Sequence, residues 1–210
     1  MRTSFSCFED VACLSLAEAG RVLRGPDANA RIWAAWFLGQ TLGFEAIEGL
    51  ELALQDEPHP GVQRHLLVVL CGLGAHAVLG RRAARDPDPY VRATATRYLA
   101  RVTGPDELGA YDLLAARMLD LAAVVRANLA DALRPDAPPE VVRLAAGFLF
   151  DPEVGVREVF RARIDRGDFD RGPFEAALEV LEHEAVVMAE PTRPSRITAL
   201  ARRVPSLELV

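Results

Sequence analysis

The chain offers few groups whose type and spacing would support catalysis or metal binding. His183 and Glu184 resemble the start of a zinc-protease helix, but the second histidine that such a helix requires is missing. Residues 165–172 carry three carboxylates, yet their spacing does not match a calcium loop, because no glutamate stands at the closing position. No serine or cysteine stands beside a histidine and an acid in a pattern typical of a nucleophile. We therefore predict no catalytic residue, no metal site and no cofactor.

The cysteines and the N-terminal residues predict a cytoplasmic protein that does not bind a membrane. Cys7, Cys13 and Cys71 have no paired spacing, so they indicate neither a disulfide framework nor a cysteine-based zinc site. Unpaired thiols fit a reducing compartment. Glu9 and Asp10 stand where a secretory signal would need its apolar core, and no apolar run is long enough to cross a bilayer.

The charge disfavours nucleic acid as a partner. All 24 basic residues are arginine, against 30 acidic residues, and the formal net charge is −6. Residues 1–105 hold equal numbers of acidic and basic groups, so the whole deficit lies in residues 106–210. A chain with no net charge in one half and a negative net charge in the other is poorly suited to attract polyanions over long distances.

A repeated pattern determines the elements that must position any site. Each copy has an apolar residue, here called the anchor, which is usually followed by Arg; further apolar residues follow four and eight positions after the anchor. In the second copy Gln63 stands in the place of the Arg. The anchors are 29 to 34 residues apart, which is the length of one helical hairpin. The five anchors are Ala30, Val62, Val91, Val125 and Val156.

This pattern predicts an all-α protein, an α-solenoid of helix pairs separated by Gly and Pro turns. Asp27, Asp88 and Asp151 precede anchor helices and can cap them. No segment alternates with a period of two over the length of a strand, so no sheet is predicted. With further helices near residues 8–23, 173–188 and 195–204, the count is about twelve helices in six antiparallel pairs.

The copies resemble the HEAT-like repeats, in particular the short bacterial form with the signature Asp-Pro-x-x-x-Val-Arg. Residues 86–92 and 151–157 are its clearest copies. The resemblance implies a binding surface rather than an enzyme. It also implies a single repeat domain over residues 1–210, with an N-terminal capping helix in 1–24, core repeats in 25–165 and a C-terminal capping repeat in 166–210.

The recurring Arg after the anchor is expected to be structural. In the resembling family this Arg pairs with an acid near the preceding turn and ties hairpins together. Asp86, Asp120 and Asp151 stand five residues before their anchors, where such a pairing is available. Regular ion pairs are a usual device for registering stacked repeats. The arginines expected to have this role are Arg31, Arg92, Arg126 and Arg157.

The positions two, five, six and nine residues after each anchor are expected to face outward, on the side that the resemblance implies is concave. In the first two copies they are mostly apolar, which is typical of a site for another protein. Trp33 and His65, three residues after their anchors, are instead expected in the core. The predicted partner-binding residues are Ile32, Trp36, Arg64, Leu67, Val68, Cys71 and Arg97, with Arg64 and Arg97 as the polar rim.

The interpretation we favour is a non-catalytic adaptor or scaffold subunit that binds, stabilises or positions a partner protein, for example an enzyme. Two alternatives are a small-molecule site in the same groove and a DNA-lesion-binding protein similar to the HEAT-like alkylpurine DNA glycosylases. The chain departs from the glycosylase pattern, because Trp33 and Trp36 have no Asp one turn later and Asp131 has no neighbouring aromatic residue. The apolar patch would also be explained if residues 1–24 folded over it.

Overall fold

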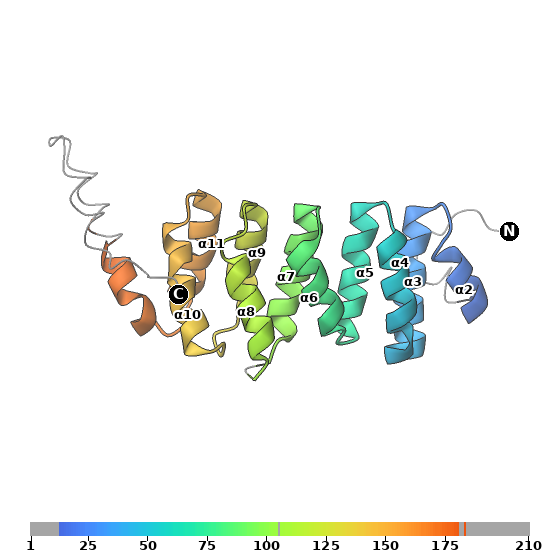
Figure 1. Cartoon of the computed structure of the whole chain (residues 1–210), viewed down its shortest axis with the longest axis horizontal. Helices are drawn as coiled ribbons and strands as arrows, with labels where there is room; N and C mark the ends of the chain where they lie inside the picture. Colours follow the sequence, from blue (N-terminus) through green and yellow to red (C-terminus); the bar gives the residue numbers. More distant parts are fainter. Residues whose placement is uncertain (1–12, 105, 181–182, 184–210) are drawn as a thin grey trace. The chain divides into compact units, whose positions relative to one another are not determined.

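The computed structural model describes residues 13–104, 106–180 and 183, and the chain divides into two compact units, Met1–Pro173 and Phe174–Val210. None of the described residues is in a β-strand, and the first unit consists of helices joined by short turns (Figure 1). The single domain predicted over residues 1–210, with its caps, stays a prediction. The α-helices are α2 (Leu16–Val22), α3 (Ala28–Leu42), α4 (Ile47–Asp56), α5 (Pro60–Gly72), α6 (His76–Arg85), α7 (Pro89–Val102), α8 (Leu108–Arg117), α9 (Ala123–Ala132), α10 (Pro139–Ala145) and α11 (Val154–Asp165), and the 3-10 helices are η1 (Gly43–Ala46), η2 (Ala146–Phe150) and η3 (Gly172–Phe174).

The first unit has two rows of helices. The anchor helices α3, α5, α7, α9 and α11 form one row, in which each helix contacts the next. The helices between them form the second row, in which α6 contacts α8 and α8 contacts α10. Figure 1 shows the helices of this unit following one another in chain order from α2 to α11. Each anchor helix is therefore covered on two sides, by its neighbours in its own row and by the second row.

Two of the anchor helices begin at capping aspartates, as the sequence predicts. One carboxylate oxygen of Asp27 accepts hydrogen bonds from two backbone N–H groups in the first turn of α3, at 2.9 and 3.2 Å. Asp88 does the same for α7, at 2.7 and 3.0 Å. The prediction of Asp151 as a cap is wrong, because the N-cap position of α11 is Glu153, and the backbone N–H that the Asp151 carboxylate accepts, at 2.8 Å, belongs to Glu153 rather than to the first turn of α11.

The core confirms the register of the repeat. Val91, Val125 and Val156 are fully buried, and the anchors Ala30 and Val62 are 3% and 1% exposed. Every residue four or eight positions after an anchor is also buried. These residues are Ala34, Leu38, Leu66, Leu70, Ala95, Leu99, Leu129, Leu133, Phe160 and Ile164.

One glycine lets two anchor helices approach closely. A Cβ atom on Gly39 of α3 would lie 2.6 Å from Cγ1 of Val69 in α5. Such a distance is well below van der Waals contact, so any side chain at this position would push α3 and α5 apart.

The predicted terminal helices are described only in part. Of the helix predicted at 8–23, α2 occupies Leu16–Val22 and begins at a capping box between Ser15 and Glu18. Residues 175–180 of the second unit are helical, within the range predicted at 173–188, whereas the helix predicted at 195–204 lies outside the described residues. None of the helices in the described part of the chain has the length and apolar character needed to cross a bilayer.

Candidate protein-binding site

Arginines after the anchors form a ladder along the turns of the first unit. Nε and Nη2 of Arg92 donate to the two carboxylate oxygens of Asp120, each at 2.9 Å, while Nη1 donates to the backbone carbonyl of Asp86 at 2.7 Å. Each arginine thus joins the turn before its own helix to the acid of the next turn. Equivalent two-pronged ion pairs are Arg31 with Glu57 and Arg126 with Asp151.

Three of the four expected arginines form these ion pairs, but with acidic partners other than the predicted ones. The fourth, Arg157, donates to the backbone carbonyls of Asp151 and Pro152 and has no ion pair with a carboxylate of the described residues. The sequence predicted pairing with the acid of the preceding turn; that residue instead supplies its backbone carbonyl, and the carboxylate comes from the following turn. Hydrogen bonds from arginine hold the pKa of Asp120 and of Asp151 below the ordinary aspartate value. Because both carboxylates are buried, these pairs belong to the scaffold rather than to an accessible site.

At the copy where the sequence has Gln63, the ladder has no arginine–carboxylate ion pair from the anchor helix. The amide of Gln63 donates to the backbone carbonyl of Glu57. Asp86 is paired with Arg82 of α6 instead, at 2.8 Å, and the same guanidinium donates to the carbonyl of Leu54 at 2.8 Å. A residue of the second row therefore replaces the missing arginine.

The exposed face of the anchor helices is rotated from the predicted one. Positions five residues after the anchor, predicted to face outward, are buried in the first four copies, and Leu67 is among them with no exposed surface. Leu67 is therefore not available to a partner, which corrects the prediction. Conversely, His65 is exposed and Trp33 is half-buried, so the prediction that they lie in the core is wrong for His65.

Three neighbouring anchor helices share a partly exposed surface, which we call the α3–α5–α7 face. Its members lie two, three, six or ten positions after their anchors and keep at least part of their surface accessible. Cys71, nine positions after its anchor, lies half-buried at the edge of the face. The main members are Ile32, Trp33 and Trp36 on α3, Arg64, His65 and Val68 on α5, and Thr94, Arg97 and Arg101 on α7.

Side-chain contacts show that equivalent positions of neighbouring anchor helices lie on the same side. Arg97 and Asp131 both stand six positions after their anchors, and their side chains form an ion pair at 2.8 Å. Arg101 lies 3.9 Å from the same carboxylate. Trp36 and Val68 hold the same register on α3 and α5, so they belong to the same surface.

The α3–α5–α7 face carries two side chains, Cys71 and His65, of types that occur in catalytic sites. Burial raises the pKa of the Cys71 thiol, with Arg101 acting in the opposite direction, so the thiol is not activated as a nucleophile. The imidazole of His65 contacts the backbone carbonyl of Gly61, at 2.8 Å from Nδ1. Across the described residues, no group of three or more His, Cys, Asp or Glu side chains is arranged to hold a metal ion.

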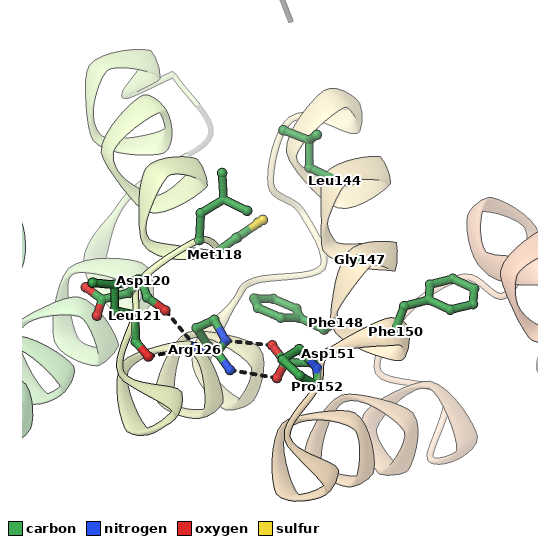
Figure 2. Close-up of a pocket in the computed structure, with 11 residues that line it drawn as sticks. Met118, Asp120, Leu121, Arg126, Leu144, Gly147, Phe148, Phe150, Asp151 and Pro152 are labelled. Carbon is green, nitrogen blue, oxygen red and sulfur yellow. Dashed lines mark hydrogen bonds and ion pairs between the residues drawn. The ribbon is translucent and has the colours of Figure 1, made fainter. Parts of the chain in front are cut away.

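A second apolar surface, which sequence reasoning missed, lies beside the ladder. A pocket of about 360 Å³ is bounded by the turn after α8, by α10 and by η2 (Figure 2). Leu121 is 100% and Leu119 79% exposed, and Leu144 and Phe150 are each 49% exposed. Figure 2 shows the Arg126–Asp151 ion pair among the residues that line this pocket. The only signal in the sequence is a pair of leucines on either side of a ladder aspartate.

The two rows of helices and the ladder define an all-α solenoid built from repeated helical hairpins. Comparisons with known proteins agree with this class. Residues 47–134 match the family model described as HEAT repeats. The X-ray structure of YibA from Escherichia coli is similar with a TM-score of 0.59 and 19% sequence identity, over 84% of this chain and 69% of that one. No curated protein matches the chain. The chain is therefore similar to HEAT repeat proteins over residues 47–134, and its fold is that of an all-α solenoid.

Proposed function

We propose that this chain is a non-catalytic adaptor or scaffold subunit, which binds a partner protein on the α3–α5–α7 face and stabilises or positions it. Proteins built from HEAT repeats commonly act as scaffolds for protein interactions, which supports the general assignment. A partner enzyme is one example of a protein that such a subunit would position.

One observation carries the proposal: two tryptophans and two aliphatic side chains lie partly exposed on adjacent helices. Trp36 and Ile32 of α3 and Val68 of α5 are half-buried rather than enclosed. Large aromatic side chains in a partly apolar surface with an arginine rim are characteristic of protein interfaces. The alternative is that residues 1–24 cover this patch. Of these residues, α2 contacts α3, yet Trp36 and Ile32 keep accessible surface, and residues 1–12 lie outside the described part.

The test begins with purification of the tagged chain under native conditions and identification of the proteins that co-elute. The affinity of the recovered partner is then measured for the wild-type chain and for Trp36→Ala. Loss of a central aromatic residue typically costs about 2 kcal/mol, so we expect binding to weaken about 30-fold. The thermal melting temperature is measured for both chains, because Trp36 is partly buried and a loss of binding must be separated from a loss of stability.

A matched control is Phe150→Ala, since Phe150 is an exposed aromatic residue of η2, which packs mainly against α10 and α11 rather than against the helices of the α3–α5–α7 face. Its loss should leave binding unchanged. Equal effects of the two substitutions would place the partner elsewhere and refute the proposal. If Trp36→Ala unfolds the chain, Val68→Ser supplies the same test on the neighbouring helix, and normal binding by that folded variant would also refute it.

A further inference from the structure

Acidic residues are absent from the three helices that form the α3–α5–α7 face. None of the residues of α3, α5 or α7 is Asp or Glu, whereas α9 and α11 carry Asp131, Glu158 and Asp165. The whole chain has a net charge of −6, so these three helices differ from the chain as a whole in having no acidic residue. The face therefore presents cationic side chains in a protein that is acidic overall.

Four acids in the turns at the ends of these helices are already engaged in the scaffold. Asp27 and Asp88 cap α3 and α7, and Glu57 and Asp86 are buried in ion pairs of the turns. These four carboxylates are therefore held by backbone N–H groups or by scaffold arginines. They do not neutralise the arginines on the exposed side of the same helices.

Two of the three arginines on the face share a single counter-ion, and the third has no ion pair with any carboxylate that the structure describes. Arg97 and Arg101 both approach Asp131, which lies on the next anchor helix. Arg64 is exposed, and no carboxylate of the described residues lies within ion-pair distance of it. A guanidinium in this situation offers its planar set of N–H donors to an incoming anion.

We infer that the partner places an acidic segment with at least one large apolar side chain on the α3–α5–α7 face, an inference that rests on the proposed function. The carboxylates of this segment bind Arg64 and Arg97, and its apolar side chain packs against Trp36 and Val68. Arginine binds carboxylates through two parallel hydrogen bonds, which fixes both position and direction. The neighbouring apolar side chains select a protein segment over a simple polyanion.

Duplex DNA fits this surface less well than an acidic peptide does. DNA-binding proteins commonly neutralise about six to ten phosphates, and their affinity depends chiefly on those contacts. The α3–α5–α7 face has three arginines, and two of them already approach Asp131. Its aliphatic members, Ile32 and Val68, form neither hydrogen bonds nor ion pairs with phosphates.

The inference is tested by selecting binders from a phage-displayed library of random 12-residue peptides on the immobilised full chain. We expect the enriched peptides to combine Asp or Glu with Leu, Phe or Trp. Each is then synthesised in two forms, one as selected and one with every Asp and Glu replaced by Asn or Gln. The amide form should bind at least about tenfold more weakly, and salt should weaken the acidic form.

Charge-reversal variants show which arginines are used. Arg64→Glu should weaken binding of the acidic peptide by about tenfold or more, whereas Arg85→Glu, an exposed arginine of α6, should have little effect. Enrichment of neutral or basic peptides, enrichment of no peptide, or equal binding of the amide form would overturn the inference. In those cases a partner complex that still depends on Trp36 would leave the proposed function standing. Competition by a short DNA duplex against the partner itself would refute both.

Discussion

Arg92 and Arg97 lie five residues apart on α7, yet they have different surroundings. Arg92 forms a two-pronged ion pair with Asp120 on the turn side of the molecule, where the carboxylate is almost completely buried. Arg97 lies on the α3–α5–α7 face, and its ion pair with Asp131 is exposed to solvent. The same residue type therefore serves the scaffold at one position and an accessible surface at the other.

The two positions also differ in how strongly their residue type is repeated from copy to copy. One position after the anchor, four of the five copies have Arg, because every pair of adjacent hairpins must be joined by a similar contact. Six positions after the anchor, the five copies have five different residues: Trp36, Val68, Arg97, Asp131 and Ala162. Stacking places no common demand on that position, so its chemistry is available for recognition of a partner.

The largest effect is expected when a ladder ion pair is broken. Asp151→Ala leaves the guanidinium of Arg126 without its carboxylate in a nearly buried position, which should lower the free energy of unfolding by about 3 kcal/mol or more. Chemical denaturation measures this directly. Asp112→Ala, the same change at an exposed position of α8, should stay within about 0.5 kcal/mol of wild type. Similar losses for both variants would show that the ladder contributes no special stability.

The ladder also predicts loss of stability in acid. The pKa of Asp120 and of Asp151 is lowered in the folded chain, so between the folded value and the unfolded value of about 3.9 the unfolded chain binds more protons. The stabilisation is fully present above that value and is lost as the pH falls below about 4. Denaturation curves at several pH values should show a shallower acid dependence for Asp151→Asn than for wild type. An unchanged slope would mean that Asp151 does not contribute.

A smaller effect is expected from a cavity in the core. Val91→Ala removes two methyl groups at a fully buried anchor and should cost about 1 to 3 kcal/mol, less than larger Leu or Ile truncations. Val154→Ala is the matched change at a residue that is 50% exposed, and its cost should be clearly lower. A melting temperature unaffected by Val91→Ala would contradict the register of the repeat.

The smallest effect tests the missing ion pair. Gln63→Arg places a guanidinium one position after the anchor, as in the other copies, where it could pair with Asp86. It should stabilise the chain by at most about 1 kcal/mol, because Asp86 is already paired with Arg82. Gln63→Met, of similar length but without a donor, controls for side-chain size. A gain equal for both substitutions would show that the charge is irrelevant at this position.

The sequence predicts the buried side of the anchor helices well. The spacing of zero, four and eight places these residues within about 80° of one another on a helix, so one core stripe follows from the pattern alone. The exposed side is predicted less well, because helical spacing identifies only the core side of an anchor helix. Neighbouring anchor helices also cover its flank, which buries Leu67 and leaves His65 exposed.

Other features depend on contacts that a local pattern does not contain. The acid that pairs with each ladder arginine lies 25 to 28 residues further along the chain, so the choice between the preceding and the following turn is a matter of tertiary packing. The pocket beside Leu119 and Leu121 forms where a turn meets η2. Helical periodicity does not predict this arrangement, because Leu119 and Leu121 lie in the turn after α8 and not in a helix.

The most direct test of this comparison is the free energy of unfolding of Arg92→Gln and Arg97→Gln, measured side by side in urea. We predict that Arg92→Gln loses about 3 kcal/mol, because Asp120 would be left buried without its main partner, and that Arg97→Gln loses at most about 1 kcal/mol. Equal losses, or a larger loss for Arg97→Gln, would contradict the assignment of one arginine to the scaffold and of the other to the α3–α5–α7 face.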